Sequence, residues 1–164
     1  MKNMRIKGMI LFLMTALLFF PVKAEAVGIL DTTKEVTLTI SCKDGDRGIA
    51  NAGFEIYQIG GITEAAEIIP NAAFDGRLPK LRKLSGSEWR DLTQELCQLT
   101  QGENLAPADR GYTDENGMLR FPQDGKKLEQ GLYLIVGGSA RQNGYSYTLS
   151  SCLVFLPSED AERK

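Results

Sequence analysis

Three cysteines are the residues with the most evident chemistry in this sequence of 164 residues, which contains no histidine. A nucleophilic thiol needs a neighbouring base, and histidine is the residue that most often serves. Histidine is also the commonest metal ligand and the central member of Ser-His and Cys-His sites. The composition therefore argues against a hydrolase or a metalloenzyme, and we expect no enzymatic activity and no cofactor.

Cys42 and Cys152 are the candidates for a disulfide bond. Cys42 shares the apolar face of one expected strand and Cys152 begins another, so a bond between them would join two strands of one domain. Buried free thiols are the alternative, because sequence spacing does not define how three cysteines pair. Cys97 falls on an expected helix beside Leu96 and has no base for nucleophilic chemistry.

Acidic residues at two expected turns offer oxygen atoms of the kind that bind calcium. They are Asp44 with Asp46, and the run Asp114-Glu115-Asn116. Neither group has the spacing of a 12-residue calcium loop, and acidic residues are common in turns that bind no metal. We therefore favour solvated turns over a metal site.

Aromatic and basic residues suggest binding surfaces rather than catalysis. Tyr112, Tyr145 and Tyr147 would form a platform for a sugar or a peptide, and core filling or cross-strand pairing is the alternative. The cluster Lys80-Leu81-Arg82-Lys83 is interpreted as a solvated loop, with contact to a polyanion as the alternative. A net charge of -2 predicts no nucleic-acid partner.

Residues 1–26 have the three parts of a secretory signal peptide. A basic start precedes the apolar run Met9–Phe20, and Ala24 and Ala26 form an A-x-A cleavage site. About 20 apolar residues are needed to span a bilayer, so cleavage is favoured over a retained anchor. The sequence predicts a secreted mature domain of residues 27–164.

Alternating apolar residues and turn signals predict short strands on both sides of one helix. The expected strands cover residues 35–42, 53–59, 112–113, 118–121, 131–136, 145–149 and 152–156. Asn-Gly pairs at 116–117 and 143–144 predict hairpin turns. The capping box Ser85-x-x-Glu88 and an apolar face predict a helix that ends at Gly102.

The arrangement of these elements predicts a mainly β domain. Residues 60–83 hold several glycines and prolines and are expected to be irregular, with short strands at most. Together with the helix they form an insertion at about 60–105. We predict an immunoglobulin-like or prealbumin-like β-sandwich with one inserted amphipathic helix.

Three stretches carry a resemblance to known surface proteins. They are the first strand leading into Gly53–Tyr57, the segment Thr113–Phe121, and the strand Gly131–Val136 followed by Gly144-Tyr145. Their order resembles the prealbumin-like sandwiches of Gram-positive surface proteins, namely collagen-adhesin B-type modules and the N-terminal domains of pilin subunits. The resemblance implies an exported, wall-associated protein with a structural or adhesive function.

The sequence also departs from that family. Many members form a Lys–Asn isopeptide bond assisted by a buried acid, but the place of the acid falls at Gly137. Lys43 is the one candidate for the lysine, and the family's asparagine lies on a strand after Pro157 that this sequence does not contain. We predict no isopeptide bond, and no L-P-x-T-G sorting signal is found around Leu156.

A sandwich without its last strand would expose an unpaired sheet edge. Such an edge can accept a strand from a partner, so we expect other pilin or surface-protein subunits to bind by strand addition. A truncated or decayed gene is the alternative. The leading hypothesis is a non-enzymatic surface module of pilin or adhesin type whose host or matrix ligand is unknown. The alternative is a free secreted protein that binds carbohydrate, matrix protein or a protease.

Overall fold

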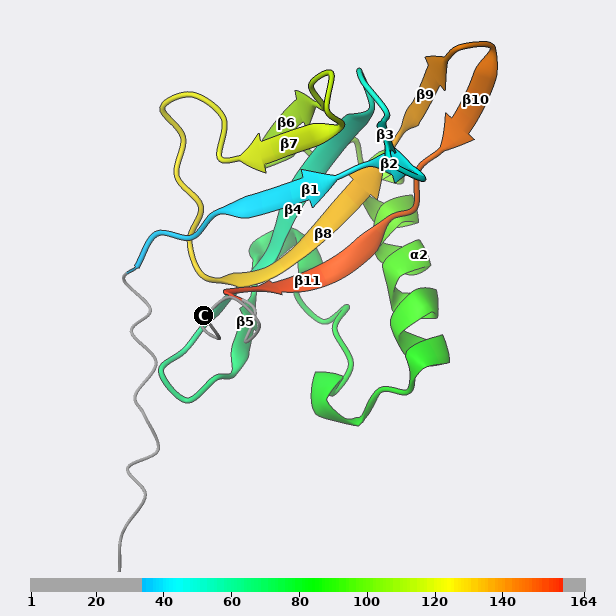
Figure 1. Ribbon diagram of the computed structural model, residues 1–164. Coiled ribbons are helices and arrows are strands. Elements are labelled where there is room, and N and C mark those ends of the chain that lie inside the picture. Colours follow the sequence, from blue (N-terminus) through cyan, green and yellow to red (C-terminus); the bar gives the residue numbers. More distant parts are fainter. Residues whose placement is uncertain (1–33, 158–164) are drawn as a thin grey trace, which may run out of the picture.

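The computed structural model describes residues 34–157 (Figure 1). The expected signal peptide and its cleavage site at Ala24 and Ala26 lie outside the described residues. Within residues 34–157, no helix is both long and apolar enough to cross a bilayer.

One antiparallel sheet of five strands forms the centre of the domain. Its strand order is β11-β8-β4-β5. The fifth strand, β6, lies on the same side of β4 as β5: β6 pairs with the first half of β4, and β5 pairs with the second half. The strands are β4 (Gly53–Ile62), β5 (Ile68–Pro70), β6 (Asp109–Tyr112), β8 (Gly131–Gly137) and β11 (Cys152–Leu156). The first five residues of β8 are buried, which confirms the central strand predicted from its apolar sequence.

A two-stranded sheet covers one face of this central sheet. It pairs β1 (Leu38–Ser41) with β7 (Met118–Phe121) in antiparallel register. The apolar residues on alternate positions from Val36 to Cys42 pack on the core beneath, as the sequence pattern predicted. The two layers enclose a cluster whose largest fully buried side chains include Phe121 and Tyr133.

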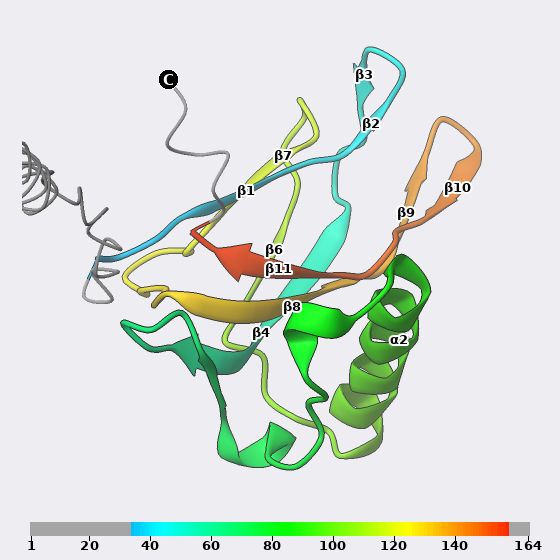
Figure 2. The ribbon, with the colours of Figure 1, turned by 90° about the horizontal axis from the view of Figure 1, so that it is seen from below.

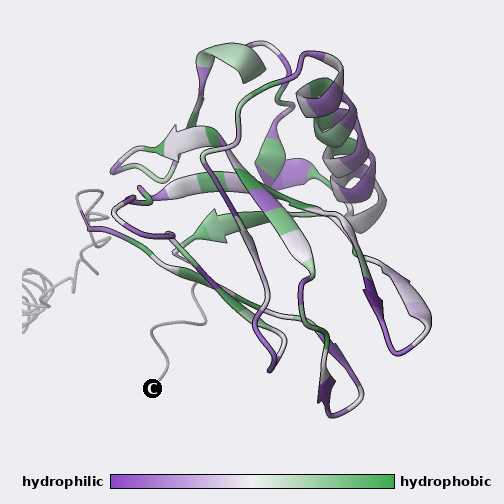
Figure 3. Cartoon of the chain, turned by 90° about the horizontal axis from the view of Figure 1, so that it is seen from above, coloured by the Kyte–Doolittle hydropathy of each residue, from purple (hydrophilic) through white to green (hydrophobic). Residues whose placement is uncertain are grey.

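Helix α2 (Gly86–Gly102) covers the opposite face of the central sheet (Figure 2). Ser85 and Glu88 form the predicted capping box, and Leu92 and Leu96 are buried in a second apolar cluster. Figure 3 shows hydrophilic and hydrophobic residues alternating along α2, as expected of an amphipathic helix. The prediction of one inserted amphipathic helix is therefore confirmed.

The connection from β4 to α2 is mostly irregular. Apart from β5 it contains two single-turn 3₁₀ helices, η2 (Ala72–Phe74) and η3 (Leu81–Lys83). Phe74 is buried in the same cluster as the apolar face of α2. The irregular excursion expected at residues 60–83 begins only at residue 63, because β4 continues to Ile62, and it packs against the helix side of the sheet.

Two hairpins project side by side from one end of the domain (Figures 1 and 2). They are β2–β3 and β9–β10, with strands Lys43–Asp44, Arg47–Gly48, Ser139–Gln142 and Tyr145–Thr148. The Gln142 amide joins them, because its nitrogen donates to the Gly48 carbonyl at 2.9 Å and its oxygen accepts from the Ala50 N–H at 2.8 Å. Asn143 and Gly144 have positive φ values of 53° and 81°, as the predicted turn requires.

The other Asn-Gly pair does not form the expected hairpin. The strands on its two sides belong to different layers, because β6 pairs with β4 and β7 pairs with β1. The Asp114 carboxylate accepts hydrogen bonds from the N–H groups of Asn116 and Met118 and shapes the turn locally. The Asn-Gly signal thus specifies the turn, whereas burial on the two layers selects the strand partners.

The predicted fold class is confirmed as a mainly β architecture of antiparallel sheets with one α-helix in the described part of the chain. The central sheet separates two apolar clusters. One lies between the sheets, and the other lies between the central sheet and α2.

Candidate functional site

The outer edge of the central sheet is β11. Within residues 34–157, β11 pairs with β8 alone, so every second residue directs its backbone N–H and C=O away from the sheet. Leu153 and Phe155 face α2, whereas Val154 and Leu156 face the core between the sheets. A strand edge with an apolar flank is thus available to a partner.

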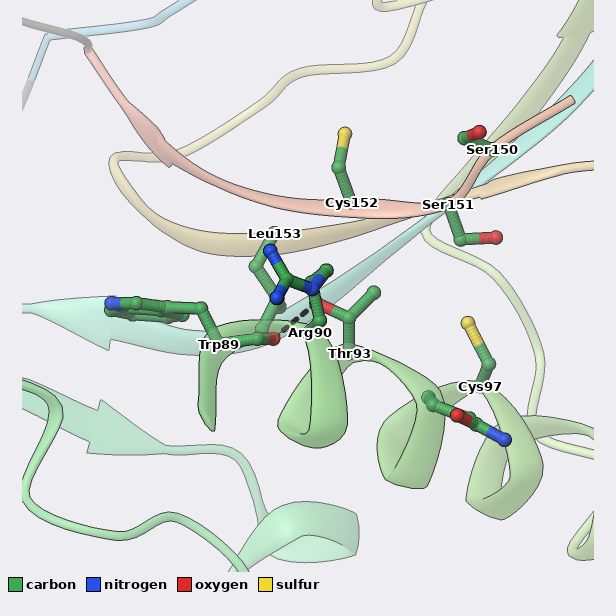
Figure 4. Close-up of a pocket in the computed structure, with 9 residues that line it drawn as sticks. Trp89, Arg90, Thr93, Cys97, Ser150, Ser151, Cys152 and Leu153 are labelled. Atoms are coloured by element: carbon green, nitrogen blue, oxygen red, sulfur yellow. Dashed lines mark hydrogen bonds between the residues drawn. The ribbon is translucent and has the colours of Figure 1, made fainter. Parts of the chain in front are cut away.

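An open groove runs between α2 and the beginning of β11 (Figure 4). Its volume is about 590 Å³. Trp89, Thr93 and Cys97 line it from the helix, and residues 150–153, which lead into β11 and form its first two positions, line it from the other side. The groove adjoins the start of β11, so a chain that pairs with β11 would place side chains beside it.

Trp89, which lines the groove, belongs to an aromatic pair that joins α2 to β11. Trp89 on α2 and Phe155 on β11 meet edge to face, with ring centroids 6.1 Å apart and planes at 83°. Phe155 nevertheless remains 39% exposed. This pair joins the helix to the edge strand and leaves apolar surface next to the free edge.

The groove exposes more apolar than polar surface, although five of its nine lining residues are polar, namely Arg90, Thr93, Gln94, Ser150 and Ser151. The Thr93 hydroxyl donates to the Trp89 carbonyl within the helix at 2.8 Å, and the Ser151 hydroxyl accepts from the Gly137 N–H at 3.3 Å. Arg90 is the single charged residue that lines this groove, and it is exposed. The groove can therefore hold apolar side chains, with a cation at its rim and hydrogen-bonding groups along the strand.

The structure contains Cys42, Cys97 and Cys152 as free thiols. Cys97 and Cys152 both line the groove, but in Figure 4 the Cys152 side chain points away from α2. Desolvation raises the pKa of Cys152, and the nearby Cys97 raises it further; desolvation also raises the pKa of Cys42. Because the thiolate is the nucleophilic form, these shifts disfavour reactivity. The Cys42–Cys152 disulfide stays a prediction.

A second hollow lies on the helix side of the sheet, near the last turn of α2. It has a volume of about 410 Å³, and its lining includes Glu55, Gln101, Arg110 and Tyr112. Tyr112 is 69% exposed, and its ring lies over Gly53, the residue opposite it on β4. The hollow therefore combines an aromatic ring with a carboxylate, a guanidinium group and an amide.

Glu55 in this hollow is oriented by a neighbour on the same strand. Its carboxylate accepts a hydrogen bond of 2.8 Å from the Tyr57 hydroxyl. Burial and this hydrogen bond raise the pKa of Tyr57 to about 12, so the hydroxyl remains a donor at neutral pH. The carboxylate keeps acceptor capacity for a ligand hydroxyl.

The predicted tyrosine platform is not formed as one surface. Tyr112 and Tyr145 line different hollows, and the half-buried Tyr147 donates to the Asp44 carboxylate at 3.1 Å. Asp44 is thus held by Tyr147, and Asp114 by its own turn. Among residues 34–157, no three acidic or thiol side chains gather as a metal site would require.

The positions that the isopeptide motif would need are also visible. A Cβ atom at Gly137 would lie 2.6 Å from the Leu149 Cβ, so a side chain there would displace Leu149. Lys43 is exposed on β2, at the projecting end of the domain. The absence of the cross-link remains a prediction, and these positions favour it.

The aromatic pair at the edge strand was not predicted from the sequence. Trp89 is half-buried, with one side packed against the apolar cluster and the other at the groove. The alternation of β11 was the available signal, because it places Leu153 and Phe155 on the helix side together. The contact between Trp89 and Phe155 still depended on how α2 lies across the sheet.

Comparisons with known proteins found no match for this chain. No protein-family model, no curated protein and no solved structure matches the chain. The resemblance to pilin and adhesin domains therefore rests on the residues named above.

Proposed function

We propose that this chain is a secreted cell-surface module of pilin or adhesin type, without enzymatic activity, which binds a partner by strand addition at β11. The observation that carries the proposal is the combination of an edge strand with an adjoining apolar groove. Edge strands are normally protected by charges, prolines or bulges. The five residues of β11, CLVFL, contain no charge and no proline, and Pro157 follows only after the strand ends. Backbone hydrogen bonds would supply affinity, and the groove would supply selectivity.

The signal peptide expected at residues 1–26 and the resemblance to surface domains support an extracellular role. Other pilin or surface-protein subunits are the partners that strand addition favours. A structural or adhesive function needs only such binding, and it makes no demand on a base, a metal or a cofactor.

The test is a pair of matched variants in the native cells. Phe155→Lys places a charge on β11, and Ile69→Lys places one on β5, whose Ile69 is also an exposed apolar residue at 62%. After cross-linking of intact cells, blots of wall and medium fractions should show high-mass species for wild type and Ile69→Lys but mainly monomer for Phe155→Lys. Equal amounts of high-mass species in both variants would exclude β11 as the edge that binds the partner. A single wild-type band in the medium would favour a free binding protein.

A free secreted saccharide-binding protein is the second candidate, and the Tyr112 hollow favours it. A sugar ring can stack on an exposed aromatic ring while its hydroxyl groups form hydrogen bonds with neighbouring donors and acceptors. Tyr112→Ala should weaken binding of chitotetraose or cellotetraose about tenfold in an NMR titration, because the stacking surface is lost. Tyr145→Ala is the control, since Tyr145 is equally exposed at 67% but lies outside this hollow. Unaltered spectra with both sugars would remove this candidate.

A further inference from the structure

A third hollow, here called the basic hollow, continues the binding surface along β11. It has a volume of about 480 Å³ and is lined by Phe155 together with Leu78, Leu81, Lys80, Arg82 and Lys83. Residues 78–83 belong to the irregular connection that precedes α2, and η3 is part of it. The hollow thus combines apolar walls with three cationic side chains.

The three cations of the basic hollow outnumber its one carboxylate. Lys80, Arg82 and Lys83 are exposed, and none of them forms an ion pair in the described part of the chain. Glu67 is the one carboxylate in the lining. The excess of positive charge favours an anionic partner at this position.

The basic hollow and the α2–β11 groove lie along the same strand. Phe155 lines the basic hollow, and its ring contacts Trp89, which lines the groove. The groove adjoins residues 150–153, at the start of β11, so the basic hollow lies towards the end of the strand. An extended segment paired with the five residues of β11 would span about 17 Å and pass both hollows.

We infer that the strand added to β11 is an extended protein segment with apolar side chains at alternate positions and acidic residues at its N-terminal end. This inference rests on the proposed function. Antiparallel pairing is the more stable arrangement, and it places the N-terminal end of the partner beside Leu156 and the basic hollow. The apolar side chains then enter the groove beside Trp89 and Leu153.

Two synthetic peptides test the inference against the full mature chain. One is an acetylated and amidated nonapeptide of two glutamates followed by alternating threonine and valine, and the other has the reverse order. The first peptide should bind up to about tenfold more tightly, because its two glutamates can form two exposed ion pairs. In NMR spectra of labelled protein, the amide signals of β11 should shift with either peptide.

Charge variants separate the two parts of the inference. Lys80→Gln, Arg82→Gln and Lys83→Gln together should abolish the preference between the peptides, whereas Lys43→Gln with Arg47→Gln on the distant β2–β3 hairpin should retain it. If both peptides bind with equal affinity and shift the β11 signals, the partner's acidic N-terminal end is overturned, whereas strand addition at β11 is retained. Unshifted β11 signals with both peptides would overturn the proposed function itself. Tighter binding of polyglutamate than of either peptide would assign the basic hollow to a polyanion instead.

Discussion

The two faces of the central sheet are covered in different ways. On the strand-covered face, buried polar side chains hydrogen-bond to backbone groups of segments far away in sequence. On the helix-covered face, in the part of the chain that the structure describes, no hydrogen bond joins α2 to the sheet, and apolar packing alone connects them. A helix satisfies its own backbone groups, so it can cover side chains but cannot pair a strand edge.

Thr113 shows how the strand-covered face is fixed. Its buried hydroxyl donates to the Ile49 carbonyl at 2.6 Å and accepts from the Ala52 N–H at 2.9 Å. These bonds join segments more than 60 residues apart in the sequence. The turn before β4 is thereby locked to the chain that leaves β6.

Asp109 performs a similar task with a charge. Its buried carboxylate accepts from the Gln123 N–H at 2.6 Å, the Arg110 N–H at 2.9 Å and the Lys126 ammonium group at 2.6 Å. Burial acts to raise the pKa of Asp109, but these three donors outweigh it and leave the pKa below its usual value. The carboxylate therefore attaches the β7–β8 connection to β6.

The two open hollows that adjoin β11 lie on the helix-covered side of the sheet. On the strand-covered face, β1 and β7 pair only with each other among the described residues, and buried polar side chains connect the segments around them. Beside α2, apolar packing reaches Leu153 and Phe155 of β11, and the groove and the basic hollow remain open next to that strand. The faces should consequently respond differently to substitution.

The largest effect should follow truncation between the two sheets. Phe121, on β7, is fully buried between the two sheets, and Phe121→Ala should lower the free energy of unfolding by about 4 kcal/mol, because a large cavity forms between two fixed layers. Chemical denaturation followed by circular dichroism measures the change. A loss below about 1 kcal/mol would contradict the rigid packing described here.

The same truncation beneath the helix should cost somewhat less. Leu96 is buried at the centre of the helix cluster, and Leu96→Ala should lower the free energy of unfolding by about 3 kcal/mol. Trp89 fluorescence should change as well, since the helix can settle towards the sheet. Glu95→Ala, on the exposed side of α2, is the control and should have an effect within about 0.5 kcal/mol. A larger loss than that of Phe121→Ala would reverse the comparison.

Removal of the buried charge tests the polar part of the strand-covered face. Asp109→Asn should lower the free energy of unfolding by about 2 kcal/mol at neutral pH, because Lys126 and two backbone donors lose a charged acceptor. The native pKa of Asp109 is lowered, so its stabilisation is present above the unfolded value near 4 and is lost as the pH falls through the native pKa. Wild type and variant should thus converge in acid. A difference that does not shrink as the pH falls would show that packing, not charge, causes it.

The smallest effect should come from the helix cap. The Ser85 hydroxyl accepts from the Glu88 N–H, and the Glu88 carboxylate accepts from the Ser85 N–H at 2.7 Å. Ser85→Ala should cost about 1 kcal/mol and increase hydrogen exchange in the first turn of α2 only. Ser146→Ala on the exposed β10 serves as the control, with no change expected. Faster exchange in β8 as well would mean that the two faces are more strongly coupled than their contacts suggest.

Local sequence signals were sufficient for many elements. The capping box marked the start of α2, the apolar run marked β8, and Cys152–Leu156 was predicted with the bounds that β11 has. Asn143-Gly144 marked a true hairpin turn. Each of these features depends on residues close together in the chain, so short-range patterns contain the necessary information.

Non-local pairing was beyond those signals. The expected hairpin at Asn116-Gly117 is wrong, because β6 and β7 find better burial in separate layers than with each other. Likewise, the tyrosines are divided between different hollows. A turn constrains a few dihedral angles, whereas the choice of strand partners depends on the apolar area that the whole domain buries.

Local patterns in the sequence were enough to predict the mainly β class and a helix with one apolar face. Packing of the whole domain makes β11 an edge strand among the described residues, brings Trp89 to Phe155 beside it, and gathers the cations of residues 80–83 at its end. The physical reason is distance along the chain. The groove and the basic hollow combine segments separated by more than 50 residues, and packing of the entire domain brings them together.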